Sequence, residues 1–240
     1  MKKQKSPLLL TFLFALLSFS AKQEVKDDDR FISFQVDPQK QDIQLYWKND
    51  KNENFKSIQN LKLALEQKNK TLVFAMNGGM YKENNSPLGL YIENGKTLSP
   101  LNTKNANGNF YMQPNGVFYL TTENVPVICT TKKFKSSKKI KYATQSGPML
   151  VIDGKIHPTF KEGSANLNIR NGVGVLSDGT VVFAMSKKEI NFYDFAEYFK
   201  KLGCKNALYL DGFVSRVYCP AKKWEQWDGD FGVMIGVTEK

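Results

Sequence analysis

The 240-residue sequence contains a single histidine, His157, and this shortage removes several classes of enzyme. One histidine cannot build a multi-histidine zinc site, and it argues against a Ser-His-Asp triad. His157 ends a predicted hairpin directly before Pro158, so we predict a structural or solvent-facing role. The sequence also lacks a GxxxxGK[ST] phosphate loop, and Gly172-Val173-Gly174 lacks the following helix that dinucleotide binding needs.

Cysteine is scarce as well, with Cys129, Cys204 and Cys219 the only three, and they show neither CxxC nor Cys/His ligand spacing. Cys204 and Cys219 lie fifteen residues apart on either side of a predicted strand. Export from the cell would permit a disulfide between them. The alternative is that all three are buried, inert thiols.

No apolar run reaches the roughly 20 residues that a membrane-spanning helix needs. The longest, Leu8–Phe19, follows a basic segment with Lys2, Lys3 and Lys5, and small residues precede Ala21. This pattern predicts a signal peptide over residues 1–20. An uncleaved anchor is the alternative. We therefore expect an exported protein, periplasmic or extracellular, without a stable membrane span after cleavage.

The remaining chain shows no linker rich in proline, glycine or serine, and no internal repeat. The polar residues 21–30 predict a flexible lead-in. Residues 31–240 are long enough to bury one full core, so we predict a single domain.

Arginine is rare although the chain is basic: Arg30, Arg170 and Arg216 are the only arginines among 34 basic residues, in a chain of formal net charge +11. Lysines concentrate over residues 132–141, with Phe134 as the only aromatic. A nucleic-acid module would interleave such charge with aromatics, so we expect no nucleic-acid partner. A solvated loop is the simpler interpretation, and attraction of an anionic substrate or envelope surface is the other.

Short β-rich runs joined by turn residues dominate the domain. Turns at Asn94-Gly95, Asp153-Gly154 and Asp178-Gly179 predict hairpins, and we expect another between the strands Phe31–Val36 and Ile43–Trp47. Further strands are expected throughout, among them Asn109–Met112, and helical spacing predicts helices over Ser57–Lys68 and Phe192–Leu202. The balance predicts an α+β fold with a mixed or antiparallel sheet, rich in hairpins, and a few packed helices.

Two of the predicted strands end at a polar side chain followed by glycine. Thr71–Met76 precedes Asn77-Gly78-Gly79, and Ala207–Leu210 precedes Asp211-Gly212-Phe213. The first glycine pair predicts either a tight turn or a row of backbone N–H groups that binds anions or sugar hydroxyls. Asp211 is a candidate acid/base, nucleophile or ligand of a hard cation, with a turn aspartate as the alternative.

Two further clusters carry suitable chemistry. Gln145-Ser146-Gly147-Pro148 places an amide and a hydroxyl at a strand end, which a turn explains equally well. Arg170 precedes a strand, and its guanidinium matches phosphate or carboxylate bidentately unless it forms a surface salt bridge. Ser215 and Arg216 follow Asp211 closely enough to serve the same pocket.

In this order the four clusters resemble the phosphodiester glycosidase family, the domain of N-acetylglucosamine-1-phosphodiester alpha-N-acetylglucosaminidase, and its bacterial exported branch. The resemblance covers most of residues 70–237 and implies cleavage between the anomeric carbon of a sugar and a phosphodiester oxygen. It implies Asp211 and Arg170 as catalytic residues. It implies substrate binding by a larger set: Asn77, Gly78, Gly79, Ser146, Gly147, Gly212 and Ser215.

The sequence departs from the family pattern beside the aspartate. Where the family has Asp-Gly-Gly followed by Gly-Ser, this chain has Asp211-Gly212-Phe213-Val214-Ser215, with Ser215 in place of the family serine. Phe213 fills space and narrows backbone freedom. Glu189 is the next carboxylate of interest, although phosphate leaves readily enough that a second carboxylate is not required.

These observations favour an exported hydrolase that acts on a sugar phosphate, either a small molecule or a glycan. We expect no obligatory cofactor, although a divalent cation at Asp211 is possible. The alternative function is a non-catalytic module that binds a glycan or envelope polymer on the same fold, and Phe213 favours it.

Overall fold

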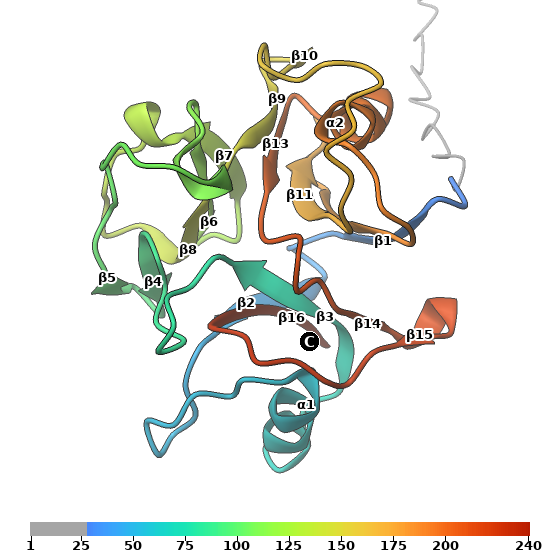
Figure 1. The fold of residues 1–240 in the computed structure, drawn as a ribbon. Coiled ribbons are helices and arrows are strands. Elements are labelled where there is room, and N and C mark those ends of the chain that lie inside the picture. The colour runs from blue at the N-terminus through green and yellow to red at the C-terminus, as the bar shows by residue number, and fades with distance from the viewer. Residues whose placement is uncertain (1–27) are drawn as a thin grey trace, which may run out of the picture.

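The computed structural model describes residues 28–240, which form three antiparallel sheets and two α-helices (Figure 1). The predicted signal peptide and residues 21–27 of the lead-in lie outside the described residues. Residues 28–30 form a turn in which the amide of Phe31 donates to the carbonyl of Asp28 at 2.9 Å, and Arg30 pairs with the Asp28 carboxylate at 2.8 Å. Within residues 28–240 no helix has the length and apolar character that crossing a bilayer requires.

The first sheet has six strands and is covered on one face by the helix α2 (Phe192–Lys201). Asn191 caps this helix by accepting the amide of Asp194 at 2.8 Å, as the sequence predicts. The buried aromatic face of α2, which includes Phe195 and Phe199, packs on the sheet. The strand order is β1 (Phe31–Val36), β12 (Val181–Ser186), β11 (Asn171–Val175), β13 (Asn206–Tyr209), β9 (Met149–Ile152) and β10 (Lys155–Ile156).

The second sheet has five strands and carries the helix α1 (Ile58–Glu66). Ser57 caps α1 by accepting the amide of Asn60 at 3.2 Å, and Ile58, Leu61 and Leu65 are buried beneath it at helical spacing. The strand order is β15 (Trp224–Glu225), β14 (Val217–Cys219), β3 (Leu72–Gly79), β16 (Val233–Glu239) and β2 (Gln41–Tyr46).

The third sheet has five strands joined by short connections. At its edge Asn94 and Gly95 both have positive φ, 48° and 75°, which is the backbone twist that the predicted two-residue hairpin needs. The strand order is β5 (Lys96–Ser99), β4 (Tyr91–Glu93), β8 (Ile140–Ser146), β6 (Gly116–Thr121) and β7 (Pro126–Thr130). Every strand pair recorded in the three sheets is antiparallel, so the predicted α+β, hairpin-rich class is confirmed.

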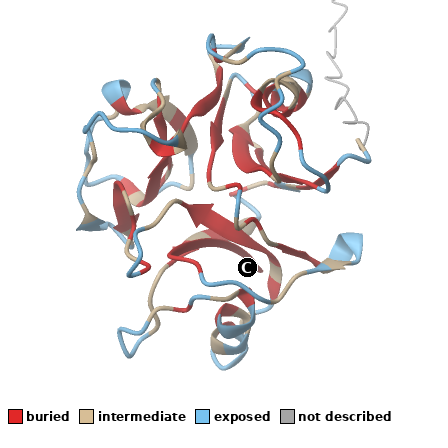
Figure 2. Ribbon diagram, viewed as in Figure 1, coloured by how far each residue is buried: buried red, intermediate tan, exposed pale blue. Residues whose placement is uncertain are grey.

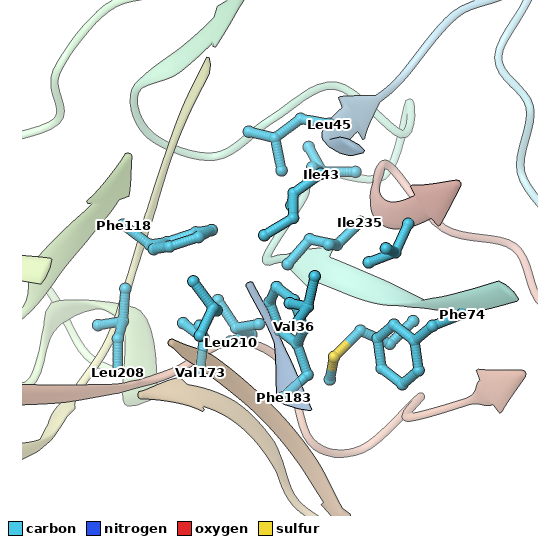
Figure 3. Packing of buried hydrophobic residues seen from close by; sticks show 14 of the residues in the cluster. Val36, Ile43, Leu45, Phe74, Phe118, Val173, Phe183, Leu208, Leu210 and Ile235 are labelled. Atoms are coloured by element: carbon cyan, nitrogen blue, oxygen red, sulfur yellow. The ribbon is translucent and has the colours of Figure 1, made fainter. Parts of the chain in front are cut away.

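One hydrophobic core fills the space where the three sheets meet. Phe183 from the first sheet has its ring centroid 5.4 Å from that of Phe74 in the second sheet and 6.1 Å from that of Phe118 in the third. Figure 3 shows these rings together with aliphatic side chains of the first sheet, such as Val173, and of the second sheet, such as Ile235. Figure 2 shows the buried segments gathered toward this centre, with exposed residues on the outer loops and outer helix faces. The three sheets therefore stabilise one another through a shared interior.

Two sequence-based expectations are wrong. The strands β1 and β2 do not form a hairpin, because β1 pairs with β12 and β2 pairs with β16. The predicted strand at Asn109–Met112 is a single 3₁₀ turn over Asn109–Tyr111. Of the two alternatives for the cysteines, the structure has free thiols: Cys204 and Cys219 are buried in different hydrophobic clusters, and Cys129 is half-buried. The other short 3₁₀ turns are Thr131–Lys133 and Pro220–Lys222.

Candidate functional site

The Asn77-Gly78-Gly79 segment continues the strand β3, so the tight turn, one of the two alternatives for this segment, does not form. Asn77 pairs with Met234 and Gly79 with Val233, so Gly78 is the extra residue of a β-bulge. A Cβ atom on Gly78 would lie 2.7 Å from the Ile235 side chain, and one on Gly79 would lie 2.6 Å from the Thr144 hydroxyl. Gly78 is therefore needed for close packing against β16 within the second sheet, and Gly79 for close packing against β8 of the third sheet.

Asn77 and Asn171 are fully buried and hold the main chain of Asp211. The side-chain amide of Asn77 donates to the Asp211 carbonyl at 3.0 Å. Asn171, at the start of β11, accepts the Asp211 amide at 2.7 Å and donates to the Asn77 side-chain oxygen at 2.9 Å. Two asparagines from two sheets thus fix the backbone of the candidate carboxylate.

The turn after Asp211 is held by further hydrogen bonds. The Ser215 hydroxyl donates to the Asp211 carbonyl at 2.8 Å, and its amide donates to the Gly212 carbonyl at 2.9 Å. The Ser146 hydroxyl, at the end of β8, donates to the carbonyl of Leu210. The structure therefore brings Ser146, Gly212 and Ser215 to the same place as Asp211.

Gly212 occupies a position that no other residue fills without displacing its neighbours. A Cβ atom there would lie 1.9 Å from the Tyr209 hydroxyl and 2.6 Å from the carbonyl oxygen of Ile169. These contacts are far shorter than van der Waals separation. Gly212 thus lets Tyr209 and the segment before Arg170 approach the turn closely.

The residue Asp211 is half-buried, and the surroundings of its carboxyl disfavour the charged form. Removal from water raises the pKa of Asp211 from 3.8 to about 7. Tyr209 and Tyr81 lie near enough for the Asp211 charge to act on their hydroxyl groups. Burial in the first place, and the Asp211 charge in the second, raise the pKa of Tyr81 to about 12. A carboxyl that exchanges its proton near neutral pH is suited to acid/base or nucleophilic work.

Arg170 lies fully buried behind this site, not in a surface salt bridge. Its Nε donates to the carbonyl of Ile190 at 2.7 Å and its Nη2 to the carbonyl of Asn166 at 2.8 Å. The guanidinium lies 3.6 Å from the centre of the Phe192 ring. Burial lowers the pKa of Arg170, while the neighbouring Tyr209 hydroxyl acts in the opposite direction.

The third nitrogen of Arg170, Nη1, is buried and makes no well-formed hydrogen bond among residues 28–240, with the Tyr209 hydroxyl as the neighbouring polar group. The other two are occupied by main-chain carbonyls, so this nitrogen is the only one left for an additional acceptor. Direct contact between Arg170 and a phosphate stays a prediction.

Gln145 and Gly147 serve the neighbouring loops. The Gln145 side-chain oxygen accepts the amides of Leu90 at 3.0 Å and Asn102 at 2.9 Å, so this residue holds the loop beside the third sheet. A Cβ atom on Gly147 would lie 2.5 Å from the Asn115 Cβ, which shows how tightly the Ser146-Gly147 corner is packed.

Other sequence candidates lie apart from Asp211. Glu189 is exposed on the loop before α2. His157 is buried in a structural position, where Nδ1 accepts the Thr159 amide at 3.2 Å and Nε2 lies 3.1 Å from the Gln113 carbonyl.

Within residues 28–240 no group of three or more His, Cys, Asp or Glu side chains is arranged to hold a metal ion. Two surface hollows lie elsewhere, one beside Asp28 and Lys187 and the other beside Lys68 and Glu239.

The sequence interpretation missed Asn171, Tyr209 and Tyr81 as parts of the site. Asn171 is adjacent to Arg170 in the cluster already singled out, but nothing in the sequence shows that its amide spans two sheets. Tyr209 belongs to a run that reads as an ordinary buried strand.

The fold and the site together define an antiparallel α+β protein that presents a carboxyl with a near-neutral pKa on a glycine-containing turn. The family model for phosphodiester glycosidase matches residues 70–229. The chain belongs to the phosphodiester glycosidase family.

Relatives agree with this assignment. The chain is 40% identical over 211 residues to the uncharacterised protein YigE of Escherichia coli K12, covering 87% of this chain and 82% of YigE. It shares its fold with the zebrafish N-acetylglucosamine-1-phosphodiester alpha-N-acetylglucosaminidase catalytic domain, solved as auto-inhibited by its pro-peptide, with a TM-score of 0.60, 13% identity, and coverage of 90% of this chain and 86% of that domain. A hypothetical protein from Synechocystis gives a TM-score of 0.55 at 12% identity, covering 88% of this chain and 59% of that protein.

Proposed function

We propose that this protein is an exported hydrolase that cleaves the glycosidic bond of a sugar-1-phosphodiester. The observation that carries the proposal is the Asp211 carboxyl, which has a pKa of about 7 and a main chain held by Asn77 and Asn171. Family membership supports the reaction class. The basic and apolar start of the sequence supports export to the periplasm or beyond.

In the proposed reaction the bond between the anomeric carbon and the phosphate oxygen breaks. The phosphate monoester leaves with the electron pair, and the oxygen of a water molecule ends on the anomeric carbon. Asp211 serves this carbon in its ionised form, either by taking the proton from water or by first bonding to the carbon as a nucleophile. Phosphate is a good leaving group, so the reaction does not require the second carboxyl that protonates the leaving oxygen in ordinary glycosidases.

The remaining residues would bind substrate or support the turn that presents Asp211. We propose that Arg170 assists the phosphate from behind the site, because its guanidinium is fully buried and the Tyr209 hydroxyl is its polar neighbour. Ser146 and Ser215 hold the main chain on either side of Asp211. The other proposed substrate-binding residues are closely packed and would support the residues that contact the substrate. They are Asn77, Gly78, Gly79, Gly147 and Gly212.

The Asp211→Asn variant tests the proposal directly. The substrate is the methyl phosphodiester of N-acetylglucosamine-1-phosphate, and released sugar is measured. We expect loss of at least 10³-fold in kcat for Asp211→Asn, because the amide can neither accept a proton nor bond to the anomeric carbon. The matched control is Glu189→Gln, which makes the same chemical change at an exposed carboxylate and should retain wild-type turnover.

The pH dependence of turnover gives a second test of the same residue. Both roles of Asp211 need the carboxylate, and burial raises its pKa to about 7. We therefore expect kcat/KM of the wild type to fall below an apparent pKa near 7 and to level off above it. A profile that instead falls as the pH rises through 7 would make Asp211 a proton donor and contradict this mechanism.

A second candidate function is a non-catalytic module that binds a glycan or envelope polymer. Phe213 favours it, since this residue replaces a glycine of the family pattern and is 88% exposed. Glycan binding without sugar release from any tested phosphodiester would support this alternative. Activity that disappears on chelation and returns with Ca²⁺ or Mg²⁺ would instead make Asp211 the ligand of a divalent cation.

A further inference from the structure

Phe213 is the most exposed large apolar side chain of the described residues. It is 88% exposed, whereas the next, Leu63 on α1, is 50% exposed. An isolated exposed apolar residue needs no explanation by itself. Phe213 differs in its position, because it lies two residues after the candidate catalytic carboxyl.

The turn that carries Phe213 is fixed at both ends. Asp211 is bound through its amide and its carbonyl, and Ser215 is bound through its amide and its hydroxyl. Between them, Gly212 is in contact with the Tyr209 hydroxyl and the Ile169 carbonyl. The Phe213 backbone therefore has a set position relative to Asp211, and the exposed ring does not result from a loose loop.

A second exposed apolar side chain belongs to the segment that packs against this turn. Leu167 is 48% exposed and precedes Ile169, whose carbonyl oxygen touches Gly212. Neither Phe213 nor Leu167 carries a group that can hydrogen-bond to a sugar hydroxyl. An aliphatic chain gains more from these two side chains than a sugar hydroxyl does, and a sugar that stacks on the Phe213 ring is the alternative that the test must exclude.

Phe213 lies close to the proposed reacting bond. It is two positions after Asp211, so the two Cα atoms lie at most about 7 Å apart. The anomeric carbon must lie against the Asp211 carboxyl itself, so the Phe213 ring is available to a substrate group further out. In a sugar-1-phosphodiester, the group on the far side of the phosphate is the alcohol esterified to it.

We propose that Phe213 is a specificity-determining residue that binds an aliphatic chain on the phosphate, so that the preferred substrates are sugar-1-phosphodiesters of lipid-like alcohols. This inference rests on the proposed function and names its substrate class. Burial of part of the Phe213 ring against the chain supplies the preference.

A pair of substrates that differ only in the alcohol tests the inference. The methyl and decyl phosphodiesters of N-acetylglucosamine-1-phosphate are compared, with the decyl ester kept below its micellar concentration. We expect wild-type kcat/KM to be about tenfold higher for the decyl ester, an effect of the size expected for removing part of one ring from water. Phe213→Gly should remove this preference through KM and leave turnover of the methyl ester within about twofold.

Two further variants separate the ring from general apolar character. Phe213→Leu keeps apolar area at the same position and should retain most of the preference. Leu98→Ala removes an exposed apolar side chain on β5, and should retain all of it. Equal wild-type kcat/KM for the two esters, or equal loss for both in Phe213→Gly, would overturn the inference. So would a stronger preference for an ester whose alcohol is a sugar, which would make Phe213 a glycan contact.

Failure of the proposed function gives a different result from failure of this inference. If the wild type releases sugar from neither ester, the hydrolase proposal fails. Calorimetric titration of both esters into the wild type and into Phe213→Gly then measures binding without turnover, and so tests the inference independently of hydrolysis. Tighter wild-type binding of the decyl ester that Phe213→Gly abolishes supports it, and equal binding overturns it.

Discussion

At the scale of single residues, the site depends on a carboxyl placed where its charge is costly. The pKa of Asp211 rises to about 7 because burial removes water from the carboxylate. A residue selected for stability alone would not be an ionisable acid in such surroundings, and functional sites commonly carry this cost. The sequence identified Asp211 from its place between a buried strand and a glycine, but its pKa depends on residues distant in the chain.

The stability of the Asp211→Asn variant should therefore depend on pH. The native state holds the Asp211 proton more tightly than the unfolded state, so wild-type stability is lost as the pH rises toward and through 7. Asparagine carries no charge at any pH. We expect Asp211→Asn to be more stable than the wild type by about 1–3 kcal/mol at pH 8, allowing for partial exposure. The difference should shrink steadily as the pH falls toward 4.

Urea unfolding of both proteins at pH 8 and pH 4.5 measures this difference. Glu189→Gln, at an exposed carboxylate, is the control and should show no such change. The same stabilisation of Asp211→Asn at both pH values would contradict a burial-raised pKa at Asp211.

At the scale of strands and turns, local chemistry predicts structure only where the partner strand is also local. Asn94-Gly95 gives the expected hairpin between β4 and β5. The turn after Asp37 also forms, with the amide of Lys40 donating to its carbonyl at 2.9 Å. Its two strands nevertheless join different sheets, because each finds its partner more than 100 residues away. Distant pairing of this kind outweighs turn chemistry and cannot be read from a short window.

The hydrogen bonds that join β3, β11 and the Asp211 turn should make a measurable contribution to stability. Replacing Asn171 by alanine leaves the Asp211 amide without its side-chain acceptor, and it removes one of the two donors to the Asn77 side-chain oxygen, which still accepts the Arg216 amide at 3.1 Å. We expect Asn171→Ala to lower the free energy of unfolding by about 2–4 kcal/mol, because unpaired buried polar groups are costly. Urea denaturation measures this loss.

Asn107→Ala, at an exposed asparagine, provides the control and should change stability by less than about 0.5 kcal/mol. The combined Asn77→Ala and Asn171→Ala variant should lose less than the sum of the single losses, since the two residues share hydrogen bonds. Strict additivity would show that the asparagines act independently.

At the scale of the whole molecule, one interior shared by three sheets makes the domain a single unit. Phe183 contacts rings of both other sheets, so no sheet can separate without exposing the common core. The sequence predicted one domain and its class from hairpin frequency and helix number. The division into three sheets could not be predicted from the sequence, because it depends on strands that pair across more than 100 residues of the chain, β1 with β12 and β2 with β16.

Thermal unfolding should consequently occur in one transition. We expect far-UV and near-UV circular dichroism to give the same midpoint, as for a single cooperative domain. Cys204 and Cys219 are free, so addition of a thiol reductant should leave that midpoint unchanged. Two separated transitions would show that the sheets unfold independently, and a lower midpoint in reductant would show a stabilising disulfide.

The hydrogen bonds from Asn77 and Asn171 fix the main chain of Asp211 without involving Phe213. The position of the carboxyl therefore depends on the two asparagines and not on the side chain at the tip of the turn. Mutation at the tip can accordingly alter which molecules are accepted while the reacting group stays in place. If the proposed function holds, the choice of substrate can therefore change by substitution at residue 213 while the position of Asp211 is kept.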